Sequence, residues 1–314
     1  MHAAASRGNW RAGVGFVLLA ATLWGMFGPV ARFALRDGVS PLEIAMWRTL
    51  IAIPLFAVHV AMTSRRRARS AAGPGHRTAL GSGRPRTRIA LADLPGIAAF
   101  ALSGVAALYA FLPLAVEAGG ATLASVLLYT APAWVALFSW GLLGERLTPR
   151  TLLALALTLC GIAGVALAGE AVVRPSRAAL GWGLGAGLSY ASLYLFGKYY
   201  FARYPPPLVF LTALPIAGLA LLPFTRFGPV SPVAAGALLV LGVASTYAAY
   251  LAYSAGLARL PATRAATIAT AEPVIASLLA FAIWNERLPL GGYAASLLVL
   301  LGVLIMATTP AADA

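Results

Sequence analysis

Residues 121–166 read ATLASVLLYTAPAWVALFSWGLLGERLTPRTLLALALTLCGIAGVA, and residues 262–307 read ATRAATIATAEPVIASLLAFAIWNERLPLGGYAASLLVLLGVLIMA. The two stretches align without gaps at an offset of 141 and share 13 of 46 positions. Shared alanines and leucines arise by chance in so apolar a chain, whereas a shared proline and a shared charged triplet do not. These informative matches are Pro132 with Pro273, and Glu145-Arg146-Leu147 with Glu286-Arg287-Leu288. The chain therefore contains two copies of one unit.

The composition places both copies in a membrane. Of the 314 residues, 61% are hydrophobic and 10% are charged, and the mean hydropathy is +0.85. Soluble domains are about 45–50% apolar and about 25% charged, so a water-soluble globule is excluded, as is a disordered chain. A membrane-spanning helix needs about 20 mostly apolar residues. The apolar runs are continuous rather than alternating, which favours helices over a β-barrel.

Ten runs are long and apolar enough to be spans, five in each half. An odd number of spans per half places the two copies in opposite orientations across the bilayer. The expected fold class is all-α integral membrane, with ten transmembrane helices in two inverted five-helix repeats. The expected spans are Gly13–Leu35, Pro41–Met62, Leu94–Val116, Thr122–Leu143, Thr151–Ala168, Leu180–Tyr200, Pro207–Phe224, Val233–Ala255, Ala262–Trp284 and Gly291–Thr308.

The net charge of +14 comes largely from one polar segment, residues 63–90. No aromatic residue interleaves with its arginines, as base stacking would require, so we expect no nucleic-acid partner. With a cytoplasmic N-terminus, 16 basic residues fall in cytoplasmic segments and six fall outside. The positive-inside rule therefore predicts that both termini are cytoplasmic. The eight arginines of the segment are Arg65, Arg66, Arg67, Arg69, Arg77, Arg84, Arg86 and Arg88.

The repeat and the charge pattern together predict the organisation of the chain. Residues 1–12 form a cytoplasmic N-terminal tail, and residues 311–314 form a C-terminal tail. The first repeat covers 13–169, including the Arg-rich loop 63–90, and the second covers 170–310. The first span is longer than the 7–15 apolar residues of a signal peptide, so we expect it to be retained.

The residues that mark the repeat also carry a family resemblance. The chain resembles the EamA-type family of the drug/metabolite transporter (DMT) superfamily from about Gly13 to Thr308. The resemblance rests on the proline before each Glu-Arg-Leu turn, on the pair Glu272-Pro273, on Gly161 and Gly302 in the last span of each half, and on Arg48 in the second span. Ala131, where the second half has Glu272, and the long Arg-rich loop depart from the family pattern. The resemblance implies ten helices in two inverted repeats and a bacterial plasma-membrane carrier, usually an exporter of amino acids, other metabolites or drugs.

Two ionisable residues lie inside expected spans, where a charge costs about 2.5–3.5 kcal/mol on insertion scales and marks function by default. Glu272 could bind a coupling proton or a substrate amine, or it could bond backbone amides freed near Pro273. Arg48 could hold a substrate carboxylate with its planar fork, pair with Glu43, or cap carbonyls of a neighbouring helix. We assign Glu272 to the substrate cavity and Arg48 to the structural and gating set.

Aromatic residues near the middle of several spans form a second group. Tyrosine and tryptophan usually gather at membrane interfaces, so these positions favour an amphipathic central cavity, with packing between helices as the alternative. The pattern favours a neutral or zwitterionic substrate with an apolar or aromatic part. The expected cavity residues, besides Glu272, are Trp24, Tyr109, Tyr129, Tyr190, Tyr194 and Tyr250.

Proline and glycine kinks inside helices would let one repeat rock against the other. The acids of the two Glu-Arg-Leu turns are expected to tie the turns between helices. Thr148-Pro149, after the first of them, is typical of an N-cap followed by a first-turn proline. The remaining gating or structural residues are Gly28, Pro29, Pro132, Pro273, Glu145 and Glu286.

Other chemistries lack their usual residues. No His/Cys cluster has metal-ligand spacing, and no phosphate-binding Gly-x4-Gly-Lys-Ser/Thr run is present. We expect no metal, no cofactor and no catalytic residues. The sequence predicts a secondary transporter, an exporter of small organic metabolites such as amino acids, that works by alternating access in the lipid bilayer. A multidrug efflux carrier is the alternative, and a channel or structural membrane protein, or an intramembrane enzyme, fits less well. A coupling proton and a homodimer are left open.

Overall fold

The computed structural model describes residues 2–71, 88–168 and 176–309. Within these ranges every regular element is a helix, which confirms the all-α class. The expected C-terminal tail 311–314, most of the Arg-rich loop 63–90 and the expected repeat boundary at 169/170 lie outside the described residues. The expected start of that loop was wrong, because residues 63–71 continue the second span as helix.

Eleven helical elements make up the first half. Three of them are not α-helical: η1 is a 3-10 helix, and η2 and η3 are π-helices. The elements are α1 (His2–Gly25), α2 (Phe27–Arg36), α3 (Pro41–Ala71), η1 (Leu91–Asp93), α4 (Leu94–Phe100), η2 (Ala101–Ala106), α5 (Ala107–Gly119), α6 (Ala121–Leu128), α7 (Ala131–Phe138), η3 (Ser139–Leu143) and α8 (Pro149–Ala168).

The second half repeats this order with fewer interruptions. Its π-helix η5 covers the positions that match η2 at the repeat offset of 141, and η4 is a 3-10 helix. The elements are α9 (Arg177–Phe201), α10 (Pro206–Leu221), η4 (Leu222–Phe224), α11 (Pro232–Val240), η5 (Leu241–Ala248), α12 (Ala249–Leu257), α13 (Ala262–Ala269), α14 (Ala271–Trp284) and α15 (Leu290–Thr308).

In the described ranges, nine stretches are long and apolar enough to cross a membrane. The remaining expected span, Leu180–Tyr200, lies in α9, an unbroken helix of 25 residues. Five glycines and four tyrosines make α9 less apolar than its neighbours. Its glycines fit close packing: a Cβ at Gly187 would lie 2.6 Å from the carbonyl oxygen of Leu127. Since α9 packs against α5, α6 and α7 and 11 of its 25 residues are buried, its lower hydropathy is compatible with a span.

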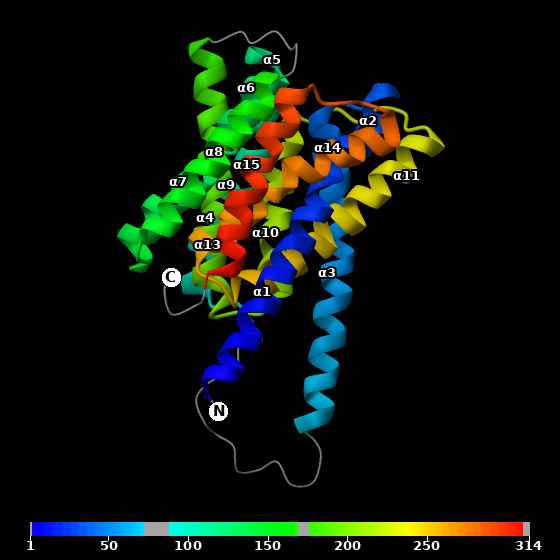
Figure 1. Ribbon diagram of the computed structural model, residues 1–314. Helices are drawn as coiled ribbons and strands as arrows, with labels where there is room; N and C mark the ends of the chain where they lie inside the picture. The colour runs from blue at the N-terminus through cyan, green and yellow to red at the C-terminus, as the bar shows by residue number, and fades with distance from the viewer. Residues whose placement is uncertain (1, 72–87, 169–175, 310–314) are drawn as a thin grey trace.

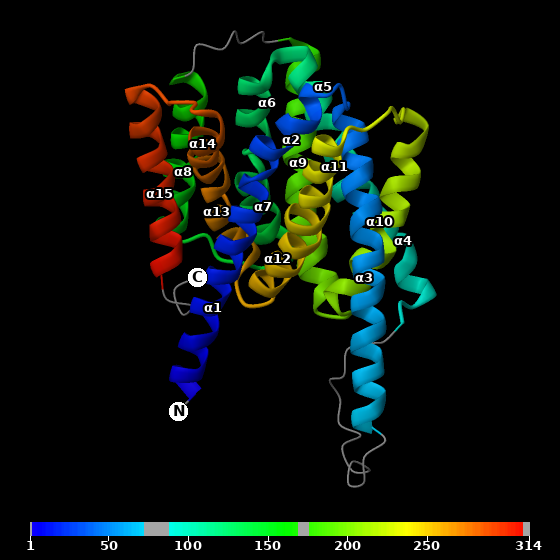
Figure 2. The ribbon, with the colours of Figure 1, turned by 90° about the vertical axis from the view of Figure 1, so that its right-hand side faces the viewer.

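The two halves run in opposite directions. In Figures 1 and 2, α1 starts at the end of the bundle where the N-terminus lies, whereas α9 starts at the opposite end. We call these the N-terminal end and the far end. Glu145 lies at the N-terminal end, where it accepts a hydrogen bond from the backbone N–H of Ala262. Its repeat mate Glu286 lies at the far end, paired with Arg32 of α2. The two inverted five-helix repeats are therefore present in the fold.

Helices α8 and α15, the last of each repeat, cross at matched glycines. A Cβ at Gly161 would lie 2.7 Å from Cγ2 of Val299, and a Cβ at Gly302 would lie 2.6 Å from Cγ2 of Thr158. Thr158 and Val299 are themselves mates at the same offset of 141. The contact of Gly161 with Val299 therefore has an equivalent in the contact of Gly302 with Thr158. Such equivalent contacts are what a two-fold relation between the repeats requires.

Three expected spans are broken rather than continuous. The breaks fall at Met26, at 129–130 and at Thr270, and each begins three residues before a proline. Proline lacks the N–H that would bond the carbonyl four residues earlier, and its ring clashes with that carbonyl. The breaks at 129 and 270 match at the repeat offset. The three prolines are Pro29, Pro132 and Pro273.

Helix α3 is long enough to leave the membrane. Its 31 residues span about 46 Å at a rise of 1.5 Å per residue, against about 30 Å for the hydrocarbon core. It starts at the far end and extends past its neighbours at the N-terminal end (Figure 2).

Candidate functional site

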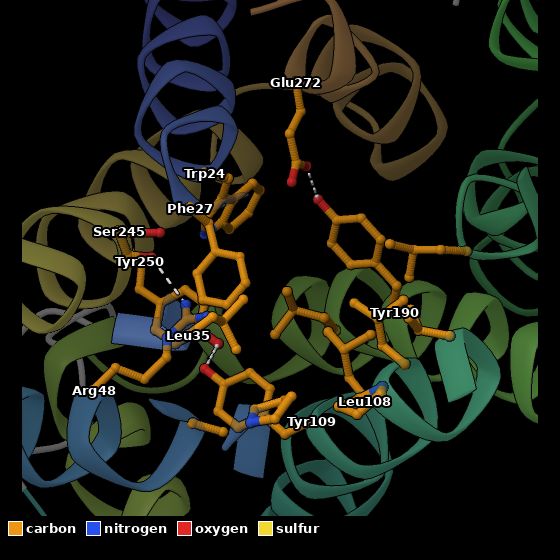
Figure 3. Close-up of a pocket in the computed structure, with 17 residues that line it drawn as sticks. Trp24, Phe27, Leu35, Arg48, Leu108, Tyr109, Tyr190, Ser245, Tyr250 and Glu272 are labelled. Atoms are coloured by element: carbon orange, nitrogen blue, oxygen red, sulfur yellow. Dashed lines mark hydrogen bonds between the residues drawn. The ribbon is translucent and has the colours of Figure 1, made fainter. Parts of the chain in front are cut away.

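A cavity of about 320 Å³ lies between the two repeats (Figure 3). Its lining is largely apolar, with six polar or charged side chains among 17 residues. Five of the seven expected cavity residues line it, together with Arg48, a residue that the sequence assigns to the structural and gating set. The lining residues are Trp24, Phe27, Leu35, Pro41, Ala45, Arg48, Leu108, Tyr109, Leu112, Pro113, Val116, Leu128, Tyr190, Leu193, Ser245, Tyr250 and Glu272.

The cavity opens toward the far end of the bundle. Leu35 and Val116, which line it there, are 44% and 40% exposed. Deeper in the bundle its floor is aromatic: the ring of Trp24 lies 6.0 Å from that of Tyr190 and 5.5 Å from that of Tyr253. The described structure is therefore open at one end and closed at the other.

Arg48 enters the cavity from the first repeat and is held by the second. Its Nε donates to Oγ1 of Thr246 at 2.8 Å, and its Nη2 donates to the carbonyl oxygen of Ser245 at 3.1 Å. Both acceptors belong to the π-helix η5, and π-helical turns occur often at functional sites. The guanidinium also lies over the rings of Phe27 and Tyr109, at 4.7 and 5.0 Å from their centroids.

The structure distinguishes between the partners that the sequence allowed for Arg48. Glu43 is not its partner, because that carboxylate accepts from Nε1 of Trp47 at 3.4 Å and from the backbone N–H of Gly228 at 3.2 Å. Arg48 binds a carbonyl of a neighbouring helix, as one alternative anticipated, and it also lines the cavity.

Glu272 lies on another wall, in the first turn of α14. Oε2 of its carboxylate accepts a hydrogen bond from the hydroxyl of Tyr190 at 3.1 Å, and Tyr129 also contacts the carboxylate. Tyrosine hydroxyls, rather than the backbone amides near Pro273, are thus the partners that the structure gives it. A Cβ at Gly25 of α1 would lie 2.9 Å from the backbone carbonyl oxygen of Glu272, so the first span approaches closely at this point.

Two tyrosines from matched positions meet on the cavity wall. The hydroxyls of Tyr109 and Tyr250 lie 3.2 Å apart, and both residues are buried. The ring of Tyr250 stacks on that of Phe210, with centroids 4.4 Å apart and planes at 7°.

Tyr129 and Tyr194 do not line the main cavity. They lie with Tyr190 and Pro132 around a second pocket of about 10 Å³, about the size of one water. Tyr194 packs edge-on against Tyr253, with centroids 5.2 Å apart. These two tyrosines extend the polar surroundings of Glu272 below the cavity floor.

Charged side chains tie the helix ends at the closed, N-terminal end. Glu145 accepts from the backbone N–H groups of Ala262 at 2.6 Å and Thr263 at 3.1 Å, the first residues of α13. Nζ of Lys198 donates to the carbonyl oxygens of Leu257 at 3.0 Å and Leu260 at 2.6 Å, just before α13. The turn into α13 is therefore anchored from both sides.

The far end carries a more exposed set of contacts. Arg32 pairs with Glu286, with side chains 40% and 51% exposed. The guanidinium of Arg36 lies 4.1 Å from the ring of Trp284, and Nε1 of Trp284 donates to the carbonyl oxygen of Pro29 at 3.0 Å. These contacts hold α2 against the end of α14 beside the cavity mouth.

The other residues of the structural set have simpler surroundings. A Cβ at Gly28 would meet nothing within 4 Å, so packing does not require glycine there. The carbonyl oxygen of Pro273 accepts from Oγ of Ser277 at 2.9 Å. Oγ1 of Thr148 accepts from the N–H of Thr151 at 3.2 Å, in agreement with the predicted N-cap before Pro149.

Sequence reasoning missed Phe27 and Ser245. Phe27 directly follows the break at Met26, which carries it to the cavity wall. Ser245 and Thr246 form a polar pair inside an otherwise apolar span, and that pair was the available signal. Among the described residues there is no group of three or more His, Cys, Asp or Glu that could hold a metal ion.

Comparison with known proteins agrees with this architecture. The model of the EamA-like transporter family matches residues 11–167 and again residues 177–308. An uncharacterized transporter of Archaeoglobus fulgidus is 27% identical over 301 residues, which cover 92% of this chain and 96% of the relative. The uncharacterized transporter YwfM of Bacillus subtilis is 27% identical over 299 residues, which cover 94% of this chain and 93% of the relative.

A solved crystal structure of a protein superimposes with a TM-score of 0.73 over 93% of this chain and 95% of that chain, at 19% sequence identity, which shows a shared fold. The two family matches together cover nearly the whole chain, and nine stretches of the described residues could span a membrane. The chain is a multi-pass membrane protein that belongs to the EamA-like transporter family, within the drug/metabolite transporter superfamily.

Proposed function

We propose that the protein is a secondary transporter that exports small organic metabolites, such as amino acids, across the bacterial plasma membrane. The observation that carries this proposal is the position of Arg48 and Glu272. Arg48 is buried and Glu272 is half-buried; they carry opposite types of charge, come from different repeats and line one cavity. Secondary transporters with inverted repeats bind substrate near the midplane, where the repeats meet.

The proposed orientation places the N-terminal end in the cytoplasm. Exposed basic residues at that end include Arg65, Arg66 and Arg259, whereas Arg32 and Arg36 lie at the far end. The bias in the whole sequence, 16 basic residues against six, supports the same orientation through the positive-inside rule. The described conformation is then open to the outside and closed to the cytoplasm.

Alternating access would require the closed end to open. The anchored turn into α13, held by Glu145 and Lys198, would release, and α2 would close the mouth beside Trp284. The broken spans provide the points at which the helices can bend. Export as the direction of transport rests on what the family resemblance implies.

A proton is the proposed coupling ion, and Glu272 is its proposed carrier. Among the described side chains, Glu272 is the only carboxylate that lines the cavity. A carboxylate at this position can release a proton and bind a substrate cation when the cavity switches from one side of the membrane to the other. The roles of the aromatic residues as cavity walls, and the division into repeats 13–169 and 170–310, belong to the same proposal.

Counterflow in proteoliposomes tests the function. Vesicles loaded with unlabelled amino acids should accumulate the labelled compound in a saturable manner, and a panel of cationic drugs should give weaker counterflow. Stronger counterflow of the drugs would favour multidrug efflux. Flux that does not saturate would indicate a channel, and no counterflow with any compound would contradict the proposal. Mass photometry of the purified protein would show whether it forms a homodimer.

A further inference from the structure

Ser245 is a buried polar group that the protein leaves without a partner. Its side chain is 0% exposed, and its Oγ makes no hydrogen bond within the described part of the chain, although the residue lines the cavity. A buried hydroxyl without a partner is unfavourable. Rotation of this side chain toward the cavity that the residue lines would let a ligand atom supply the missing partner.

Arg48 offers a second free donor at the same place. Its Nε and Nη2 are used by Thr246 and by the carbonyl oxygen of Ser245. Its Nη1 donates to no acceptor among the residues that the structure describes. The side chain is 7% exposed, and no carboxylate of the described chain pairs with it. The protein therefore holds the guanidinium in position but leaves Nη1 and the positive charge without a protein partner, so that both can interact with a ligand.

These donors suit a carboxylate. A carboxylate is an acceptor with two oxygens, one for Nη1 of Arg48 and one for Oγ of Ser245. The linked hydroxyls of Tyr109 and Tyr250 border the same region of the wall. This end of the cavity therefore suits an anion, and we call it the anion subsite.

The surroundings of Glu272 suit a cation rather than an anion. Its carboxylate accepts from Tyr190, but no Lys, Arg or His of the described residues forms an ion pair with it. The rings of Trp24 and Tyr190 border it, and aromatic faces attract cations. This end of the cavity suits an ammonium group.

The two subsites lie apart. Figure 3 shows Arg48 and Glu272 on opposite sides of the cavity, with the rings of Trp24 and Phe27 between them. An α-amino acid carries both charges on one carbon and can place only one of them well. A ligand that satisfies both subsites needs an apolar chain between its charges. The cavity volume of about 320 Å³ is at the small end of the range for ligand sites, about 300–1,000 Å³.

We infer that the cavity binds a small zwitterion whose charges are separated by an apolar chain, with its carboxylate on Arg48 and Ser245 and its ammonium on Glu272. This inference rests on the proposed function and specifies its substrate class. ω-Amino acids are the simplest members of the class. Because Arg48 belongs to the first repeat and Glu272 to the second, one such ligand bridges the two halves of the transporter.

A pair of isomers tests the inference on the unmodified protein. 6-Aminohexanoate and 2-aminohexanoate contain the same atoms and differ in the separation of their charges. Thermal stabilisation of the purified full-length protein, titrated with each compound, gives their dissociation constants. We expect the 6-amino isomer to bind about tenfold more tightly, and to bind more tightly than hexanoate or hexylamine. Equal or tighter binding of the 2-amino isomer would overturn the inference, as would equal binding of either singly charged compound.

Variants assign the two ends. In Glu272→Gln, 6-aminohexanoate should no longer bind more tightly than hexanoate. In Arg48→Gln, it should no longer bind more tightly than hexylamine. Ser245→Ala should weaken the binding of hexanoate and leave the binding of hexylamine unchanged. Ser277→Ala, outside the cavity, should change the binding of neither compound. If Glu272→Gln or Arg48→Gln still bound 6-aminohexanoate more tightly than the singly charged compound by the wild-type factor, the subsite assigned to that residue would be wrong.

The same titrations separate this inference from the proposed function. A zwitterion that binds as expected but gives no counterflow would contradict the function and leave the binding site intact. Saturable counterflow of α-amino acids without preference for the separated isomer would support the function and overturn the substrate class.

Discussion

The hydroxyls of Tyr109 and Tyr250 lie 3.2 Å apart, and the two residues are repeat mates at an offset of 141. A residue can meet its own mate only close to the axis that relates the two copies. The cavity wall formed by Tyr109 and Tyr250 therefore lies at the pseudo-two-fold axis. The charges beside it break the symmetry, because the repeat mate of Glu272 is Ala131.

The tyrosine pair should show a measurable coupling. Tyr109→Phe and Tyr250→Phe should each lower the free energy of unfolding by about 1 kcal/mol, because each leaves a buried hydroxyl without its partner. The double variant should lose less than the sum, since the bond is lost once. Unfolding in mixed micelles measures the cycle, with the exposed Tyr293→Phe as control. Fully additive losses would show that the hydroxyls do not interact.

Replacing Glu272 by glutamine should change how transport depends on pH. Glu272→Gln keeps the shape and a hydrogen-bond acceptor for Tyr190 but cannot exchange a proton. We expect the counterflow rate to become nearly independent of pH, while the wild-type rate varies. Glu117→Gln, at an exposed carboxylate that does not line the cavity, is the matched control and should keep the wild-type profile. An unchanged profile in Glu272→Gln would remove this residue from proton coupling.

Arg48→Lys should not be a silent change. Lysine keeps the charge but loses the planar fork that binds Thr246 and Ser245 together. We expect kcat/KM for transport to fall roughly tenfold. Thr246→Ser should be mild because it keeps the acceptor, whereas Thr246→Val should resemble Arg48→Lys. Normal transport by Arg48→Lys would mean that charge alone matters at this position.

The crossing of α8 and α15 should respond equally at its two glycines. Gly161→Ala and Gly302→Ala each place a Cβ within 3 Å of the facing helix, which should destabilise the protein by about 1–3 kcal/mol. Gly291→Ala, whose Cβ would lie 3.8 Å from its nearest neighbour, should be tolerated. Thermal unfolding measures all three. A clear difference between the two mates would argue against an equivalent crossing.

Cysteine labelling can determine the orientation. The chain has one cysteine, Cys160, so Cys160→Ala provides a clean background. A membrane-impermeant maleimide should label Arg226→Cys, at the far end, in intact cells. It should label Arg259→Cys, at the N-terminal end, only after permeabilisation. The reverse pattern would place the termini outside.

The sequence was sufficient for the architecture because spans and repeats are local or periodic properties. Continuous apolar runs of about 20 residues specify helices in a bilayer, and the matched Glu-Arg-Leu turns revealed the duplication. An odd number of spans per copy then required the inversion. The same reasoning identified Glu272, since a carboxylate in the middle of an apolar run is visible without coordinates.

The tertiary structure decided which of these residues meet. Arg48 binds Thr246, 198 residues away, and no sequence spacing connects an arginine in α3 with a π-helix of the other repeat. The sequence named Pro29, Pro132 and Pro273 as residues at which helices could kink, and the structure has a break three residues before each. Only the structure shows that Pro54, Pro113 and Pro215 lie inside continuous helices. Local sequence shows where a helix can bend, but contacts between helices decide where it does. Those contacts also placed Arg48 and Ser245 in the cavity wall.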